Sequence, residues 1–177
     1  VPKLAQLIEK HKVSLLLATP TFLRGYLRRA EKEQLKSVKL AITGAEKLPK
    51  KVAEAFEERF NKPVLEGYGL TETSPVTNVN MPDPDDSEVM GGTEGPTIPN
   101  HRFGSVGQFI PGVAVRITDP DTHEPLSVHT SGMIWVKGAN IIEGYLGQPE
   151  KTASVMKSGW FMTGDIGRID EDGFLYI

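Results

Sequence analysis

The chain has 177 residues, of which 38% are hydrophobic and 24% charged, enough apolar material for one large core or two small ones. It contains no cysteine, which excludes disulfides and thiolate metal sites and is typical of a reducing compartment. The net charge of −3 gives no reason to expect nucleic acid as a partner. No apolar run approaches the ~20 residues of a membrane span and no signal-peptide pattern opens the chain, so we expect a cytoplasmic protein.

The first 79 residues alternate between helical and strand patterns. Leu4, Leu7 and Ile8 recur at helical spacing after Pro2, a residue tolerated in a first helical turn. Further segments are expected as strands at 15–19, 38–43 and 63–65 and as helices over 22–30 and 49–60. This order predicts right-handed crossovers and an α/β fold with a parallel βαβαβ sheet.

The stretch 66–75, Glu-Gly-Tyr-Gly-Leu-Thr-Glu-Thr-Ser-Pro, combines several features of a phosphate-binding turn. Two glycines permit a sharp turn, and the hydroxyl of Thr71 adjoins the carboxylate of Glu72. The alternative is that both residues only cap the next helix. Polar residues also follow the strands at 19–21 and 43–46, and ligands of parallel sheets bind at the carboxyl ends of strands. This convergence favours a magnesium–nucleotide site.

The pattern changes after Pro75. Residues 80–104 are rich in proline, glycine and acid and show no periodicity, which predicts a long, flexible insertion loop at the surface. Short strands are expected at 113–117, 133–136 and 164–169, with one helix near 149–156. We therefore divide the chain into an α/β part at 1–79, the loop at 80–104 and a small antiparallel β subdomain at 105–177.

Several common motifs are absent from the sequence. It has no Walker loop, no third glycine after Gly67 and Gly69 to complete a dinucleotide fingerprint, and no Gly-x-Ser-x-Gly elbow. The four histidines lack metal-ligand spacing and are expected at the surface.

Four segments together resemble the adenylate-forming superfamily of acyl ligases, luciferases and amino-acid-adenylating modules, and the resemblance spans almost the whole chain. They are the nucleotide motif at 66–75, the adenine-side segment at 44–49, the "glycine–variable–GYL" segment at 138–146 and the ribose-binding motif at 160–165. Leu70 stands where amino-acid-adenylating modules typically have proline. The segments most resemble bacterial acyl-[acyl-carrier-protein] synthetases, often fused to a 2-acylglycerophosphoethanolamine acyltransferase, and then long-chain acyl-CoA ligases.

The resemblance implies roles for individual residues. Thr71 would donate to the α-phosphate of ATP, Glu72 would bind Mg²⁺, and Asp165 would accept both ribose hydroxyls, although Asp165 beside Gly164 could also be only a turn residue. The walls and floor of the adenine site would come from Gly44, Ala45, Glu46, Lys47, Glu66, Gly67, Tyr68, Gly69 and Leu70.

The resemblance also implies an activity. A fatty acid would be activated as acyl-adenylate and passed to a phosphopantetheine thiol of acyl carrier protein or coenzyme A. The rival hypothesis is a non-catalytic adenylate-fold module that acts in binding or as a scaffold. The intact Thr71, Glu72 and Asp165 argue against that rival.

Both ends of the sequence predict a piece of a longer protein. The chain opens at Val1-Pro2 without methionine and stops in the apolar run 174–177. The resemblance places a phosphate loop before Val1, and an arginine and a carboxy-terminal domain with a catalytic lysine after Ile177. The piece alone is therefore expected to be inactive, and a bared sheet edge is expected to favour self-association.

A basic row is expected on the second helix. Arg24, Arg28 and Lys32 recur at intervals of four, with Arg29 and Lys36 nearby. A solvated helix face is the ordinary explanation of such a row. The alternative is contact with an acidic carrier protein or with an anionic membrane, which for the full-length protein would be the inner membrane.

Overall fold

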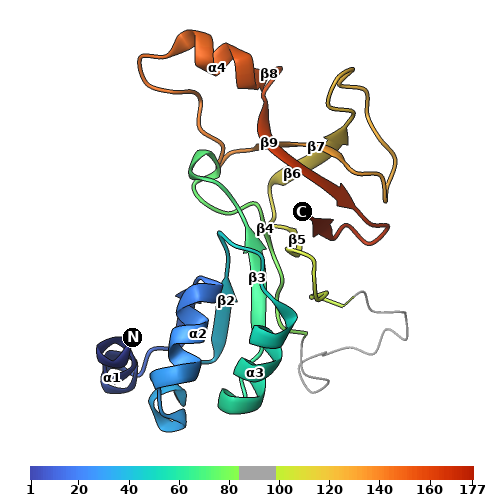
Figure 1. Cartoon of the computed structure of the whole chain (residues 1–177). Helices are drawn as coiled ribbons and strands as arrows, with labels where there is room; N and C mark the ends of the chain where they lie inside the picture. Colours follow the sequence, from blue (N-terminus) through green and yellow to red (C-terminus); the bar gives the residue numbers. More distant parts are fainter. Residues whose placement is uncertain (84–98) are drawn as a thin grey trace, which may run out of the picture. The chain divides into compact units, whose positions relative to one another are not determined.

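The computed structural model describes residues 1–83 and 99–177 (Figure 1). By its contacts the described chain divides into two compact units, Val1–Gly67 and Tyr68–Ile177. The proposed division at residues 79 and 104 remains a prediction. Among the described residues, no helix has the length and apolar character that crossing a membrane requires.

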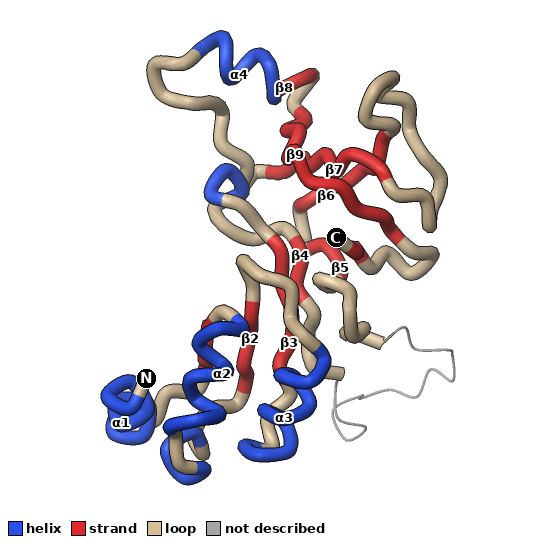
Figure 2. The backbone as a smooth tube through the Cα atoms, in the orientation of Figure 1, coloured by secondary structure: helices blue, strands red, loops and turns tan. Residues whose placement is uncertain are grey.

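The first unit is a parallel sheet with helical crossovers (Figure 2). Strand β1 pairs with β2 and β2 with β3, all in parallel, with Leu16 opposite Ala41 and Ile42 opposite Leu65. The predicted βαβαβ arrangement is confirmed. Its elements are α1 (Pro2–His11), β1 (Leu15–Ala18), α2 (Pro20–Arg29), the 3₁₀ helix η1 (Lys32–Leu35), β2 (Leu40–Thr43), α3 (Lys50–Phe60) and β3 (Val64–Tyr68).

Local signals explain where the helices begin and end. Thr19 caps α2 by accepting the Phe22 N–H at 3.4 Å, and Pro20 occupies the first turn, where its missing N–H costs nothing. Helix α3 ends at Phe60, because the next residue, Asn61, adopts a left-handed φ of 54° that stops the helix. The apolar faces of the helices meet in one core that includes Leu23, Phe56 and Phe60.

Strand β1 is only half covered. Leu16 is buried, whereas Leu15 and Leu17 on the other face are 46% and 69% exposed. Within the described residues β1 pairs with β2 alone. An edge strand presents unpaired N–H and C=O groups with which another chain can pair, and an exposed apolar face beside them favours such contact. The predicted self-association remains untested.

The second unit is mainly antiparallel, as predicted. Its larger sheet has the order β10-β9-β7-β6, and Ile117, Ile134, Val136, Phe161 and Leu175 form its core. The predicted strand at 164–169 is the second half of a longer strand that starts at Trp160. The elements are the 3₁₀ helix η2 (Thr71–Thr73), β4 (Asn78–Val79), β5 (Gln108–Phe109), β6 (Val113–Thr118), β7 (Gly132–Gly138), α4 (Pro149–Val155), β8 (Met156–Lys157), β9 (Trp160–Ile169) and β10 (Leu175–Tyr176).

The two flanks of the predicted insertion loop are bonded to each other. The buried Asn80 side chain donates to the Ser105 carbonyl at 2.8 Å and accepts the Arg102 N–H at 2.9 Å. The Met81 N–H donates to the Asn100 carbonyl at 3.0 Å. The central part of the loop, 84–98, lies outside the described residues, so the predicted flexibility there stays a prediction.

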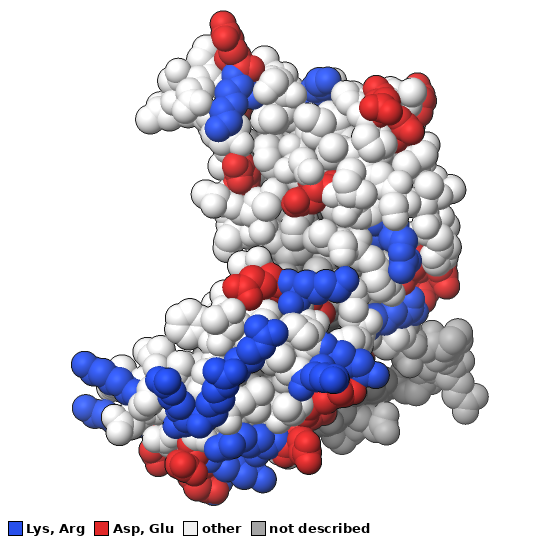
Figure 3. Space-filling view, viewed as in Figure 1, with Lys and Arg blue, Asp and Glu red and all other residues white. Residues whose placement is uncertain are grey.

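The predicted basic row is shorter than expected. Helix α2 ends at Arg29 because Ala30 adopts extended backbone angles, so Lys32 and Lys36 do not continue the row on that helix. Glu31 and Gln34 then form a capping box that starts η1. Most of the 20 lysine and arginine residues of the chain nevertheless belong to the first unit, and many of them are visible, with acidic side chains among them, on the side that Figure 3 shows.

Asp170 is the centre of a hydrogen-bond network in the second unit. Burial alone would raise the pKa of Asp170, but the Phe174 N–H, the Tyr176 hydroxyl and the Arg102 guanidinium together lower that pKa below its ordinary value of 3.8. A carboxyl group whose pKa is lower in the folded state than in the unfolded state stabilises the fold at pH values above the pKa of the unfolded state. That contribution is lost as the pH falls through the folded pKa.

We therefore expect the stability of the wild-type chain to fall below about pH 4, and the fall to be smaller in Asp170→Asn. The denaturant midpoint of each protein is measured at pH 7 and at pH 3. The fluorescence of Trp135 and Trp160, both in the second unit, reports the unfolding. Equal losses in the two proteins would contradict this role of Asp170.

Candidate functional site

In the first unit, the loop after β2 contains the predicted adenine-side residues. Gly44 lies so close to β3 that a Cβ on it would be 3.2 Å from the Gly67 carbonyl oxygen. Ala45 has a positive φ of 67°, and the exposed Glu46 accepts a hydrogen bond of 3.1 Å from the Thr21 hydroxyl. The loop therefore bends sharply at the carboxyl end of β2, beside the end of β3.

Glu66 binds this loop to β3. Its side chain is buried, and Oε1 accepts the Leu48 N–H at 2.9 Å. Burial raises the pKa of Glu66, while the Leu48 N–H and the charge of Lys47 act in the opposite direction. The carboxylate thus fixes the backbone next to Lys47, which is a positioning role for a residue predicted to line the adenine.

In the second unit, the turn 69–76 depends on close backbone packing. A Cβ on Gly69 would lie 1.8 Å from the Pro75 carbonyl oxygen, a separation that real side chains essentially never show. The buried Thr73 hydroxyl accepts the Leu70 N–H at 2.8 Å and lies 2.9 and 2.8 Å from the carbonyl oxygens of Leu70 and Pro75. Thr71 and Glu72 lie within the three-residue helix η2, whose N-cap is Leu70. The alternative that they cap a following helix is wrong.

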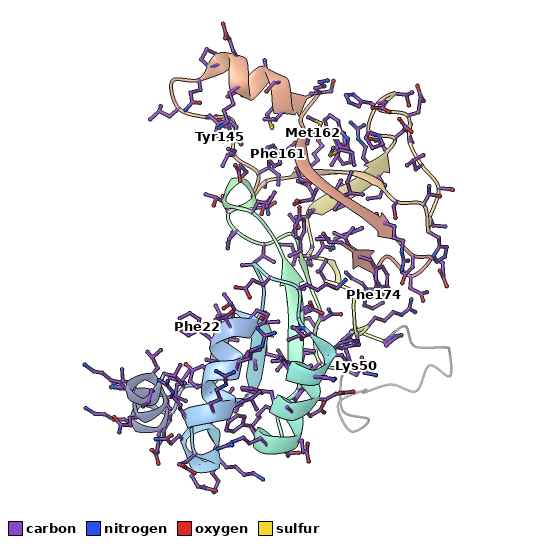
Figure 4. All side chains as sticks on the ribbon, in the orientation of Figure 1. Phe22, Lys50, Tyr145, Phe161, Met162 and Phe174 are labelled. Carbon is purple, nitrogen blue, oxygen red and sulfur yellow. The ribbon has the colours of Figure 1, made fainter. Side chains whose placement is uncertain are left out.

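Glu72 is held at both its backbone and its side chain. The Tyr145 hydroxyl donates to Glu72 Oε1 at 2.8 Å, and the Ile142 N–H donates to the Glu72 carbonyl at 2.9 Å. The Asn140 amide donates to the carbonyls of Thr73 at 2.7 Å and Val76 at 2.9 Å. The turn that presents Glu72 is therefore bonded to the segment between β7 and α4, where Tyr145 is labelled (Figure 4).

Asp165 lies inside β9 and not in a turn, which removes the alternative weighed for it. Its Oδ2 accepts a hydrogen bond of 2.6 Å from the Tyr68 hydroxyl, and its N–H donates to Thr163 Oγ1 at 3.1 Å. Burial and then the bond to Asp165 raise the pKa of Tyr68, so this hydroxyl stays protonated and remains a donor. The bond orients the carboxylate through Oδ2 and leaves the remaining lone pairs of its oxygens free to accept other hydrogen bonds.

The structure brings the predicted residues together in two groups, each within one unit. Gly44 to Lys47 lie around Glu66 and Gly67 in the first unit, and Tyr68 pairs with Asp165 in the second. Leu70 packs on the core of the second unit. Asn140, Tyr145 and Thr163 were missed as contributors, although two of them lie in the motif recognised at 138–146. Their spacing in the sequence carries no sign of which residues they contact.

The donor set suits a magnesium ion only in combination with a nucleotide. Among the described residues, no three histidine, aspartate or glutamate side chains are grouped as a metal site. Glu72 supplies a single half-buried carboxylate. Mg²⁺ is commonly bound by one or two carboxylates together with substrate phosphates and water, and a lone, oriented Glu72 fits that mode.

The fold, a parallel sheet followed along the chain by an antiparallel one, is that of the amino-terminal domain of adenylate-forming enzymes. The apo form of MatB from Rhodopseudomonas palustris superposes with a TM-score of 0.79 at 33% identity, over 100% of this chain and 32% of that one. The model of the family described as "AMP-binding enzyme" matches residues 1–146. The chain belongs to this family.

The curated relatives include two long-chain-fatty-acid–CoA ligases. That of Bacillus subtilis is 36% identical over 97% of this chain, and that of Yersinia pestis is 32% identical over 100% of it. The chain spans 28% and 29% of the lengths of these two proteins.

We expect Gly69→Ala to destabilise the second unit by about 1–3 kcal/mol, because the backbone at Pro75 must move to admit the methyl group. Gly25→Ala is the comparison variant, since the nearest atoms to its Cβ would belong to the Val1 side chain, with Cγ2 at 2.6 Å, and not to backbone, and it lies within α2, where alanine is favoured over glycine. The free energies of unfolding of the wild type and both variants are measured by denaturant unfolding. A Gly69→Ala variant as stable as the wild type would show that the turn adjusts freely.

Proposed function

We propose that the full-length protein containing this chain is an ATP-dependent acyl ligase. A fatty carboxylate attacks the α-phosphorus of ATP, the bond to the bridging oxygen of pyrophosphate breaks, and acyl-adenylate forms. A phosphopantetheine thiol then attacks the acyl carbon and AMP leaves. Membership of the AMP-binding family supports the class of reaction, and the names of the relatives support a fatty acid as substrate.

The observation that carries the proposal is the arrangement of Glu72 on its turn. A carboxylate bonded to Tyr145, on a backbone bonded to Ile142 and Asn140, is oriented before any ligand arrives. Groups that stabilise charge in a transition state act most strongly when they need not reorganise. The intact bonds around Glu72 therefore support catalysis over the non-catalytic rival.

We propose the following contacts for ATP. Gly44 to Lys47, with Glu66 behind them, line the adenine, and Tyr68 to Leu70 complete its site. Asp165 accepts the ribose hydroxyls, and its bond to Tyr68 aligns it for them. The exposed Thr71 hydroxyl donates to the α-phosphate. Glu72 is the residue that would bind magnesium, and the metal would offset the charge that develops as pyrophosphate leaves.

The acceptor thiol belongs, in our proposal, to coenzyme A or to an acyl carrier protein. The names of the relatives favour coenzyme A. The alternative is an acyl-carrier-protein synthetase with a fused acyltransferase and a role in phospholipid metabolism. The sequence resemblance supports this alternative. We also propose that lysine and arginine residues of the first unit bind an acidic carrier or an anionic membrane, and that the protein is cytoplasmic.

The test is ATP–pyrophosphate exchange by the full-length protein across a panel of fatty acids. We expect exchange with at least one chain length, and a loss of about 10²–10³ in kcat for Glu72→Ala, the size expected when one transition-state stabiliser is removed. Glu171→Ala is the matched control, because Glu171 is an exposed glutamate outside the proposed site that pairs with the exposed His129. Full activity of Glu72→Ala would favour the scaffold hypothesis.

The isolated 177-residue chain should not catalyse this exchange, although it contains most of the adenine and ribose residues. Phosphoryl chemistry depends on several preorganised cations and donors around the α-phosphate, and the family elements expected outside these residues supply part of them. The measurement is pyrophosphate exchange by the purified chain. Exchange that Glu72→Ala abolishes would falsify this prediction.

A further inference from the structure

The side chain of Tyr145 connects the candidate metal-binding carboxylate to helix α4. Its hydroxyl donates to Glu72 Oε1 at 2.8 Å, and its ring lies under the Lys151 ammonium, with Nζ 4.2 Å from the ring centroid. We propose that Tyr145 is a positioning residue that sets the orientation of the Glu72 carboxylate for a magnesium–nucleotide, with α4 as its support. This inference rests on the proposed function of Glu72.

The backbone of Glu72 does not need Tyr145 to stay in place. The Ile142 N–H holds the Glu72 carbonyl, and Asn140 holds the carbonyls on either side of the turn at Thr73 and Val76. These backbone contacts leave rotation about the Glu72 side-chain bonds unconstrained. The Tyr145 hydroxyl is the contact that acts on the carboxylate itself, so its effect falls on orientation more than on the fold.

Tyr145 is in turn fixed by α4. Its N–H donates to Thr152 Oγ1 at 2.9 Å, and that hydroxyl donates to the Gln148 carbonyl at 3.0 Å, one helical turn earlier. Gly144 permits this approach, since a Cβ there would be 2.6 Å from Thr152 Cγ2. The Lys151 ammonium above the ring is a cation–π contact that holds the ring plane.

A merely structural role does not explain this bond well. Both Glu72 and Tyr145 are only half-buried, and a hydrogen bond that water can replace contributes little net stability. A partner that orients a metal-binding carboxylate has a larger effect on binding, because its removal typically costs 10–100-fold in metal affinity or activity. The contact therefore makes most sense as preorganisation of Glu72.

The test is Tyr145→Phe in the full-length protein, which removes the hydroxyl and keeps the ring under Lys151. We expect the Mg²⁺ concentration for half-maximal pyrophosphate exchange to rise about 10-fold. We also expect the affinity for Mn²⁺, measured by electron paramagnetic resonance in the presence of a non-hydrolysable ATP analogue, to fall by a similar factor. The melting temperature should stay within a degree or two of the wild type.

Tyr176→Phe is the matched control. It removes a tyrosine hydroxyl that also donates to a carboxylate of the same unit, that of Asp170 at 3.0 Å, but which is not part of the proposed site. Its metal dependence should equal that of the wild type. If Tyr145→Phe lowers the melting temperature but leaves both metal measurements unchanged, Tyr145 is structural and the inference is overturned.

Glu72→Gln separates this inference from the proposed function. If Glu72 binds the metal, Glu72→Gln weakens Mn²⁺ binding, and adding Tyr145→Phe to it has no further effect. If Glu72→Gln weakens binding and Tyr145→Phe alone does not, only the positioning role fails. If neither variant changes metal binding, the proposed role of Glu72 fails as well.

Discussion

The contact between Gly69 and the Pro75 carbonyl is the constraint on which the candidate site depends. It allows the chain to double back directly after β3, and the Thr73 hydroxyl then bonds within the narrow turn. Thr71 and Glu72 are presented from η2 because this turn closes. Any larger residue at position 69 would open the turn and move both functional side chains from their places.

Carboxylates connect parts of the chain that are distant in sequence, and each has a different set of donors. Glu66 accepts a backbone N–H from the loop after β2, and Asp165 accepts the hydroxyl of Tyr68. Asp170 accepts from Arg102, Tyr176 and the Phe174 backbone. A partly or fully buried carboxylate is costly unless hydrogen-bonded, so these residues specify how the loops around the strands are arranged.

The turn that presents Glu72 is fixed both by the strand before it and by a segment that is distant in the sequence. The strand fixes where the turn starts, and the segment from Asn140 to Tyr145 fixes how it is oriented within the second unit. In the proposed function, Glu72 would then need little reorganisation when a ligand binds, which is the condition under which a single carboxylate can stabilise a transition state strongly. The short segment between β7 and α4 thus contacts residues some seventy positions earlier in the chain.

The amino-acid sequence predicted the order of the main helices and strands, the parallel and antiparallel sheets and the family, because apolar periodicity and local motifs are short-range properties. It did not predict the short elements η1, η2, β4, β5 and β8, which are too brief to show a periodicity. Helix α2 ended earlier than the spacing of Arg24, Arg28 and Lys32 suggested, since the backbone angles of Ala30 decide the end of the helix and charge spacing does not. Only the tertiary structure paired Tyr68 with Asp165 and Tyr145 with Glu72. These contacts join residues 97 and 73 positions apart, and no local pattern encodes which side chains meet across such separations.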